Sequence, residues 1–415
     1  MKLKKQILKY CLIAIVIMIA LNHLCVLNAQ SFVGVKGPSI VSRDGKPLIL
    51  RGVNLGFWLE PEGYPWGISD IHGARQYFDL FADLIGPDEA RKFWVSYQDN
   101  FITEQDIQYI KKLGFNSVRI PFDYRLFVNE YYLGSYEPRG FTLLDRAVKW
   151  CREEGIGVIL DMHCAPGSQA GWNSDDGYTW PWLFEDSGEE SRQLTIKIWT
   201  DIARKYSNEP TVIGYDLLGE PIHQYCDTSR VNKRLEPFYK RLTSEIRKVD
   251  KNHILFLAGA FWNRNFDVFG KPFDDKLVYT THLYSQNEGY CSFDYFSKFS
   301  RKYNVPLWLG EFGEKEPELV DSLRSEFQNE GFGWCLWTYK KMNNDHCIVQ
   351  IKQPVNFVLV QNYANGIYKE WEEKVKARPD NGKTSEALAQ YVENCKFKNC
   401  IKSDIYHKVL NLKQY

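Results

Sequence analysis

Short apolar runs alternate with longer amphipathic stretches along most of this chain. The runs are rich in β-branched and aromatic residues and predict eight strands, at residues 48–53, 117–121, 158–163, 212–218, 254–258, 277–282, 307–310 and 333–337. Between them, apolar residues recur at the i, i+3, i+4, i+7 spacing of a helix face, at residues 103–113, 143–154, 193–206, 235–249 and 318–329. Gly114, Gly155 and Gly331 follow three of these stretches, where the helices are expected to end.

This alternation predicts an α/β fold. Eight units of an apolar strand followed by a helix are typical of a parallel sheet closed into a (β/α)8 TIM barrel with enlarged loops after its strands. The alternative is an open doubly wound sheet, but no predicted strand is followed by the Gly-x-Gly-x-x-Gly turn of a dinucleotide site. Residues 39–50 read as two short strands around Asp44-Gly45, which predicts a hairpin that caps the barrel.

The first 30 residues differ from the rest. Lys2, Lys4 and Lys5 precede an apolar stretch at residues 11–20, and Ala29 stands where a signal peptidase would cut, so residues 1–30 are predicted to be a signal peptide. A retained membrane anchor is the alternative. Residues 31–415 are then expected to be secreted, extracellular or periplasmic, without stable membrane association. They contain no low-complexity linker and are predicted to form one domain with a helical, then irregular, tail.

Composition narrows the range of partners. Lys and Arg number 52, as do Asp and Glu, and the formal net charge of zero gives no reason to expect nucleic acid. The 13 tryptophans and 25 tyrosines suit stacking on sugar rings, although they also fill large cores. No zinc-type spacing of Cys and His is present, so neither a metal nor another cofactor is predicted.

The ten cysteines support only open predictions. In an oxidising compartment, Cys226 with Cys291 and Cys395 with Cys400 are candidate disulfides, because they lie in loop-like or terminal stretches. Cys151, in an apolar helical pattern, is expected to be a buried thiol, and so is Cys335 in a strand pattern.

A barrel of this kind carries its functional groups at the carboxyl ends of its strands. The polar and aromatic residues there are Arg119, His163, Glu220, His282, Tyr284, Glu311 and Trp337. Glu220 and Glu311 are expected to face each other across one cleft, about 5 Å apart. Such a pair suits cleavage of a glycosidic bond, because one carboxyl protonates the leaving oxygen while the other attacks the anomeric carbon or activates a water. For either glutamate alone, an ion pair with Arg119 or a lysine is the alternative.

Several stretches resemble glycoside hydrolase family 5, of the cellulase-like clan A, and the resemblance runs from about residue 37 to 340. The matching stretches are Arg51-Gly-Val-Asn-Leu-Gly-Phe-Trp-Leu-Glu-Pro, Gly114-Phe-Asn-Ser-Val-Arg-Ile-Pro, Asp161-Met-His, Gly219-Glu-Pro, His282-Leu-Tyr and Leu309-Gly-Glu-Phe-Gly. The resemblance implies a retaining, double-displacement mechanism with Glu220 as acid/base and Glu311 as nucleophile.

The same resemblance implies supporting roles. Arg119 would keep Glu311 ionised and Tyr284 would hydrogen-bond it. His163 and His282 would line the sugar subsite, and Trp337 would form a platform under the sugar.

Two motifs, beginning at Arg51 and at His163, are most similar to the exo-β-1,3-glucanase branch, so a β-glucan-type polysaccharide or oligosaccharide is the expected substrate. Trp172, in the loop at residues 171–185, and Trp262 are further candidate sugar contacts. Two alternatives stay open: a non-catalytic glycan-binding barrel, and a family member that acts on mannan, xyloglucan or a glycolipid.

Gly219 departs from the family pattern. Members of the family carry Asn immediately before the acid/base, where the amide binds the 2-hydroxyl of the substrate. Loss of that hydrogen bond should raise the barrier unless another group replaces it. Trp262-Asn263, His223 or a water could replace it; alternatively, the substrate lacks an equatorial 2-hydroxyl.

Overall fold

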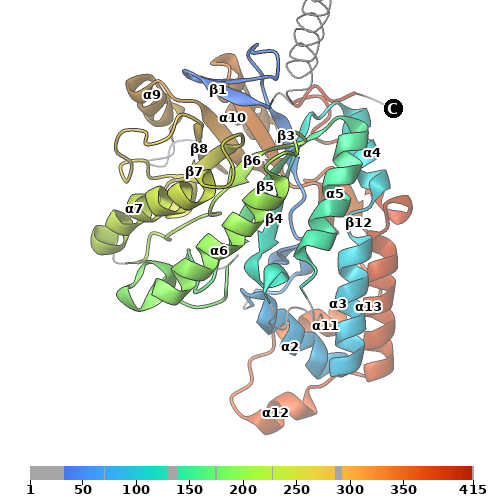
Figure 1. Ribbon diagram of the computed structural model, residues 1–415. Coiled ribbons are helices and arrows are strands. Elements are labelled where there is room, and N and C mark those ends of the chain that lie inside the picture. The colour runs from blue at the N-terminus through green and yellow to red at the C-terminus, as the bar shows by residue number, and fades with distance from the viewer. Residues whose placement is uncertain are drawn as a thin grey trace, which may run out of the picture.

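A closed barrel of parallel strands forms the centre of the molecule (Figure 1). The computed structural model describes residues 32–69, 71–128, 138–172, 175–226, 228–285 and 292–413. The barrel runs in the order β10-β3-β4-β5-β6-β7-β8-β9. Its strands are β3 (Arg51–Asn54), β4 (Ser117–Asp123), β5 (Gly157–Cys164), β6 (Val212–Asp216), β7 (Ile254–Ala258), β8 (Leu277–His282), β9 (Leu307–Gly313) and β10 (Gly333–Trp337). The predicted (β/α)8 barrel is confirmed.

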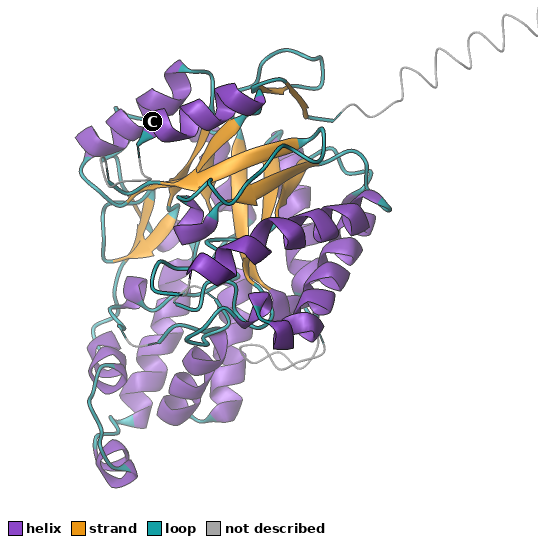
Figure 2. Cartoon of the chain, turned by 90° about the vertical axis from the view of Figure 1, so that its left-hand side faces the viewer, coloured by secondary structure: helices purple, strands orange, loops and turns teal. Residues whose placement is uncertain are grey.

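Helices surround the barrel in both views (Figures 1 and 2). Those that directly precede a barrel strand in the chain are α4 (Glu104–Leu113), α5 (Gly140–Glu154), α6 (Glu189–Tyr206), α7 (Thr228–Arg247), the single turn α8 (Ala260–Asn263), α9 (Phe293–Tyr303) and α10 (Pro317–Asn329). All five predicted helices are present. Gly114 and Gly155 end α4 and α5 in the left-handed conformation, with φ of 100° and 63°, which glycine adopts without a steric penalty.

A hairpin fills the amino end of the barrel. Its strands are β1 (Gly34–Lys36) and β2 (Ser39–Val41), and Val33 and Ile40 pack against side chains inside the barrel, so the hairpin is a cap as predicted. Its paired strands lie earlier than expected. The chain folds back again at Asp44-Gly45, and the N–H of Leu48 donates to the carbonyl of Ile40 at 2.8 Å, but this pairing is a single isolated bridge, so residues 48–50 form no strand.

A second layer of helices covers one side of the barrel, and of this layer the sequence pattern predicted only the helical tail. Its helices are α2 (Ala74–Ile85), α3 (Pro87–Asn100), α11 (Phe357–Ala364), α12 (Trp371–Lys376) and α13 (Asn381–Cys395). The indole N–H of Trp66 donates to Tyr391 in α13 at 2.7 Å, and Trp94 and Tyr97 pack around the same indole. The C-terminal helix therefore belongs to the same hydrophobic core as the barrel.

A buried lysine ties the chain after β10 to this layer. Lys340 begins β11 (Lys340–Met342), which forms a small sheet with β12 (Val349–Ile351) and β13 (Ile401–Lys402). Its Nζ lies 2.6 Å from Asp106 in α4 and donates to the carbonyl of Cys395, at the end of α13, at 2.9 Å. Lys340 and Asp106 are both fully buried.

The cysteine predictions have mixed outcomes. Cys395 and Cys400 are free thiols, so their predicted disulfide is wrong; the short turn between them leaves Sγ of Cys400 3.5 Å from the carbonyl oxygen of Cys395. Cys151 and Cys335 are buried thiols, as predicted. Cys226 is a free thiol, and its predicted partner Cys291 lies outside the described residues.

The predicted signal peptide, residues 1–30, also lies outside the described residues. Within the part of the chain that the structure describes, no helix is both long enough and apolar enough to cross a bilayer.

Candidate active site

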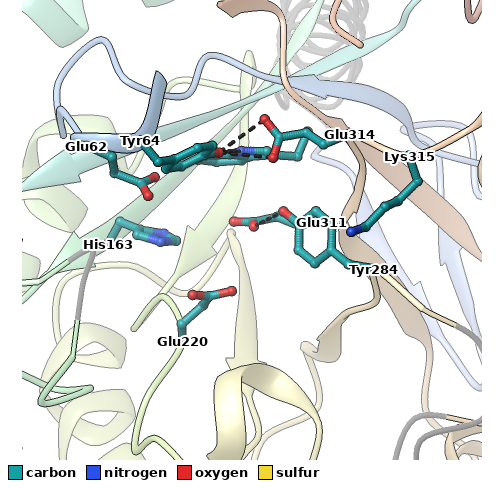
Figure 3. Close-up of a pocket in the computed structure, with 9 residues that line it drawn as sticks. Glu62, Tyr64, His163, Glu220, Tyr284, Glu311, Glu314 and Lys315 are labelled. Carbon is teal, nitrogen blue, oxygen red and sulfur yellow. Dashed lines mark hydrogen bonds between the residues drawn. The ribbon is translucent and has the colours of Figure 1, made fainter. Parts of the chain in front are cut away.

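A cavity of about 290 Å³ opens at the carboxyl ends of the barrel strands (Figure 3). It is lined by Glu62, Tyr64, His163, Glu220, Tyr284, Glu311, Glu314, Lys315 and Trp337. Five of these nine residues belong to the predicted site. Arg119 and His282, also predicted, lie directly behind the lining and contact Glu311.

The two glutamates meet in this cavity. Glu311 lies within β9, and Glu220 follows shortly after β6 ends. One carboxylate oxygen of each, together with a ring nitrogen of His282, all lie within 4.8 Å of one another. Carboxyls about 5 to 5.5 Å apart suit direct attack on an anomeric carbon, whereas about 6.5 to 9.5 Å leaves room for an intervening water. The spacing therefore fits covalent displacement.

Arg119 supplies the positive charge beneath the site. Its guanidinium lies 2.6 Å from Glu311, 2.9 Å from Asp216 and 3.0 Å from Asp161. Burial by itself would lower the pKa of Arg119, but the three carboxylates raise it, so the group stays charged. The other oxygen of Glu311 accepts from the hydroxyl of Tyr284 at 2.8 Å. Glu311 is thus held by one charged group and one hydroxyl.

His163 faces the cavity from the end of β5. Its Nδ1 lies 2.8 Å from Oδ2 of Asp161, and its ring stacks on Trp337 with centroids 6.1 Å apart. Burial lowers the pKa of His163, which leaves the imidazole neutral, and burial raises the pKa of Asp161 to about 7 although Arg119 opposes this. The indole N–H of Trp337 donates to the hydroxyl of Tyr64 at 2.9 Å.

Four aromatic rings form a surface beside Glu220, outside the cavity lining. We call Trp172, His223, Tyr225 and Trp262 the aromatic shelf. The ring of His223 lies 5.6 Å from Trp172, 5.5 Å from Tyr225 and 6.3 Å from Trp262. Trp172 is 46% exposed and Tyr225 is 66% exposed. The predicted contacts Trp172 and Trp262 therefore lie next to the cavity, not in it.

The two groups proposed from sequence to replace the amide at position 219 do not reach the cavity lining. Asn263 is fully buried, and its Oδ1 accepts from the N–H of Glu220 at 3.1 Å. His223 Nδ1 accepts from the N–H of Tyr225 at 3.0 Å, within the aromatic shelf. Asn263 thus positions the backbone of Glu220 instead of binding sugar.

Unusual backbone conformations gather around Glu220. Glu220 and Ile222 have φ of 47° and 56°, and Phe261, Trp262 and Asn263 lie between 53° and 65°. Left-handed backbone costs about 1–3 kcal/mol for each residue other than glycine, and such residues cluster at functional sites. The N–H of Phe261 donates to the carbonyl of Ile222 at 2.7 Å, which holds the two loops together. The surrounding fold therefore imposes the conformation that aims Glu220.

Sequence reasoning missed four residues of the cavity. Glu62 and Tyr64 come from the loop after β3, and Glu314 and Lys315 come directly after β9. The hydroxyl of Tyr64 donates to Glu314 at 3.1 Å, which closes the cavity wall across from Glu220 (Figure 3). Their position just past two barrel strands was the available signal.

Comparisons with known proteins show the family of this chain. The family model for cellulase (glycosyl hydrolase family 5) matches residues 83–343. A β-xylosidase of Phanerodontia chrysosporium is 31% identical over 75% of this chain and 71% of its own length. A sporulation-specific glucan 1,3-β-glucosidase of Saccharomyces cerevisiae is 33% identical over 51% of this chain and 49% of its own length. Thus the chain spans only about half of the second relative.

One solved structure supports the fold alone. The crystal structure of an endogalactoceramidase superposes with a TM-score of 0.56 at 18% identity, covering 74% of this chain and 75% of that one.

Proposed function

We propose that this chain, which belongs to glycosyl hydrolase family 5, cleaves β-glycosidic bonds with retention of configuration at the anomeric carbon. The family membership makes it a glycoside hydrolase with a carbohydrate substrate. One observation carries the stereochemical proposal: Glu220, Glu311 and His282 place their polar atoms within 4.8 Å of one another, the spacing of a retaining pair.

The proposed reaction has two steps. An oxygen of Glu311 forms a bond to the anomeric carbon while the bond to the leaving oxygen breaks, and Glu220 gives its proton to that oxygen. Glu220, now a carboxylate, takes a proton from a water that attacks the same carbon and releases Glu311. Arg119 and Tyr284 hold Glu311 in line and stabilise its charge in both steps.

We propose that the aromatic shelf binds the leaving part of the substrate. His223 follows Glu220 by only a few residues, and Trp262 precedes Asn263, which holds the Glu220 backbone. The shelf therefore lies on the side of the proton donor, where the leaving group departs. Exposed rings of this kind stack on the apolar faces of sugars. The preferred substrate is then a glycan with further sugars on that side.

A β-glucan-type polysaccharide or oligosaccharide is the proposed substrate class, supported by the motifs at Arg51 and His163 and by the glucan 1,3-β-glucosidase relative. A β-xyloside is the second candidate, because the β-xylosidase relative matches three quarters of the chain. The two differ in the hydroxymethyl group of the sugar, so a panel of aryl β-glucoside and β-xyloside, with the corresponding glycans, separates them.

The deciding experiment follows the products of a β-glycan panel by NMR. The first product formed should be the β-anomer. Initial release of the α-anomer contradicts the retaining proposal, and binding of oligosaccharides without turnover on any β-glycan favours a glycan-binding barrel.

We also propose that the mature chain is secreted. The three lysines, the apolar stretch at residues 11–20 and Ala29 support a cleaved signal peptide and a secreted mature chain. N-terminal sequencing of the protein recovered from the medium or periplasm tests this, with cleavage near Ala29 as the expected result.

A further inference from the structure

We infer that Glu185 is a positioning residue: together with Arg230 it clamps the two loops that carry the aromatic shelf, and so fixes the spacing of Trp172 and Tyr225. The inference rests on the proposed function, because it concerns the rings proposed to bind the leaving part of the substrate. It makes an ion pair outside the shelf a determinant of affinity for long substrates.

The two halves of the shelf come from different loops. Trp172 lies between β5 and α6, whereas His223 and Tyr225 lie between β6 and α7. The rings of Trp172 and Tyr225 meet with centroids 5.6 Å apart and planes inclined by 45°. Both rings are exposed, so the packing of other side chains does little to hold them in place. The positions of the two loops therefore set the spacing of the rings.

The two loops are linked at two places. The first link is a backbone hydrogen bond, in which the N–H of His223 donates to the carbonyl of Ala170 at 3.2 Å. The second link is the clamp, formed by Glu185, which precedes α6, and Arg230, in the first turn of α7. The guanidinium of Arg230 donates to both carboxylate oxygens of Glu185, at 2.7 Å to Oε1. Two hydrogen bonds between an arginine and a carboxylate fix their relative orientation as well as their distance.

The surroundings of Glu185 favour a clamp that holds its geometry. Fully exposed ion pairs contribute little, because water screens the charges and both side chains lose freedom. The side chain of Glu185 is only 12% exposed, and a second arginine, Arg234, lies 3.5 Å from its carboxylate. An ion pair with two hydrogen bonds and one sheltered partner is the kind that does restrain a structure.

Glu185 reaches Trp172 through a short chain of contacts. Its Oε1 also accepts from the indole N–H of Trp180 at 2.8 Å. The backbone of Trp180 and Pro181 lies directly against Gly171, where a Cβ would come within 2.7 Å of Pro181 and 2.8 Å of the carbonyl carbon of Trp180. Gly171, with φ of 77°, immediately precedes Trp172. A shift of Trp180 is therefore passed to the backbone beside Trp172.

These contacts predict which kinetic constant the clamp controls. Without it, the loop after β5 has fewer links to α7, so Trp172 and Tyr225 occupy a wider range of positions. A sugar that stacks on both rings must then order them as it binds, which lowers its affinity. Glu220 and Glu311 are held by other residues, so a substrate with no sugar on the leaving side should react as before.

The test uses two variants and two substrates. Glu185→Gln and Arg230→Met each remove one partner of the clamp, and both are assayed on an oligosaccharide and on a β-glycosyl fluoride. We expect each variant to raise KM for the oligosaccharide about 2- to 5-fold and to leave kcat and KM on the fluoride unchanged. Equal losses on the two substrates would overturn the inference, because the clamp would then support the cavity and not the shelf.

Glu189→Gln is the matched control. Glu189 begins α6 and accepts two hydrogen bonds from Arg241 of α7, at 2.7 and 3.0 Å, so it forms the same kind of pair with the same helix. Arg241 lies further along α7, beyond the part that follows the shelf. The control should leave KM for the oligosaccharide unchanged. An increase equal to that in Glu185→Gln would overturn the inference, because helix packing in general would then set the affinity.

Combined variants test the route through Trp172. In a Trp172→Ala background, Glu185→Gln should raise KM by less than about 1.5-fold further, because the ring that the clamp positions is gone. Glu185→Gln combined with Arg230→Met should raise KM no further than either change alone, since both break one clamp. Losses that multiply in either combination would contradict the clamp. Melting curves that match the control show that the changes in KM do not come from unfolding.

Binding without turnover separates this inference from the proposed function. Titration calorimetry compares the oligosaccharide Kd of Glu311→Ala with that of Glu311→Ala carrying Glu185→Gln. A weaker Kd in the second protein supports the clamp even where the wild-type protein is inactive on every β-glycan, a result that overturns only the proposed hydrolysis. An unchanged Kd overturns the clamp and leaves the proposed hydrolysis intact.

Discussion

Glu220 and Glu311 both lie against one ring nitrogen of His282. Nδ1 of His282 lies 2.8 Å from Oε1 of Glu220 and 3.3 Å from Oε2 of Glu311. Burial lowers the pKa of His282 well below its ordinary value, so the ring is neutral and has a single N–H. The same ring nitrogen thus contacts both carboxyls, while His282 itself lies outside the cavity lining.

Replacing each of the two glutamates should reduce catalysis in a different way. Glu311→Ala should lower kcat by about 10⁴-fold or more, because no covalent intermediate can form. Glu220→Ala should lower kcat about 10²- to 10⁴-fold on a glycan. It should have less effect on an aryl glycoside with an acidic leaving group, which departs without a proton. Steady-state rates on both substrates distinguish the two roles.

Added azide gives an independent readout of the same assignment. Glu220→Ala should yield the β-glycosyl azide, because azide replaces water in the second step, whereas Glu311→Ala should yield the α-glycosyl azide by direct displacement. Glu318 lies in the first turn of α10, and the variant Glu318→Gln is the control. It should form no glycosyl azide. The same azide anomer from both variants would contradict the assignment.

The buried neutral state of His282 should make stability depend on pH. Below about pH 6.5 an unfolded histidine binds a proton, whereas folded His282 does not until much lower pH. The unfolded state therefore gains protons as the pH falls. The free energy of unfolding should drop by up to about 1.4 kcal/mol per pH unit from this group. Compared with His282→Asn, the wild-type protein should lose stability below about pH 6.5 and show a constant difference above about pH 7.

Urea unfolding at a series of pH values measures that difference. Because other groups titrate in both proteins, only the difference between wild type and variant reports on His282. A difference that stays constant from about pH 5 to 7.5 would show that the folded ring takes up its proton as readily as the unfolded one.

Removing a ring of the aromatic shelf should weaken the binding of long substrates only. Trp172→Ala and Tyr225→Ala should each raise KM for an oligosaccharide about 3- to 10-fold, since stacking contributes about 0.5–1.5 kcal/mol. A β-glycosyl fluoride has no sugar on the leaving side and should be hydrolysed at nearly the wild-type rate. Trp371→Ala removes a tryptophan that is 74% exposed on α12 and serves as the control. Equal losses on fluoride and oligosaccharide would place the rings at the cavity itself.

Lys340 should be a stability determinant. Lys340→Met leaves Asp106 buried without its cation and should lower the free energy of unfolding by about 3–5 kcal/mol. Lys197→Met breaks an exposed pair with Asp201 on α6 and should cost less than about 1 kcal/mol. Chemical unfolding followed by tryptophan fluorescence compares the two. Similar small losses would mean that the interior at Lys340 relaxes to admit water.

Local patterns were sufficient to predict the barrel and the residues at its strand ends. Six of the eight barrel strands are buried along their whole length, and β3 and β5 are buried at all but their first residue. Continuous apolar runs therefore marked the strands, and the polar residues that closed these runs stood out. Glu220 and Glu311 could be paired before any coordinates, because the carboxyl ends of barrel strands converge on one face. This pairing required only the order of the strands along the chain.

Features that depend on contacts between distant segments were not predictable. Helices α2 and α3 pack against α13, nearly 300 residues later in the chain, and no local sequence pattern indicates such a partner. The cavity wall from Tyr64 to Glu314 joins two loops that meet only in the fold. Likewise, the ring of His163 lies against Gly219, a contact between two strand ends that no local sequence pattern indicates.

The position of the hairpin at the amino end of the barrel determines from which face a linker at the N-terminus leaves the molecule. Phe32 packs edge-on against His253, just before β7 begins, while the catalytic cavity lies past the opposite ends of the strands. A linker joined ahead of Phe32 therefore leaves from the face turned away from substrate. Enzyme immobilised on beads through this end should keep its full rate on insoluble glycan, whereas coupling through lysines such as Lys315 should obstruct the opening.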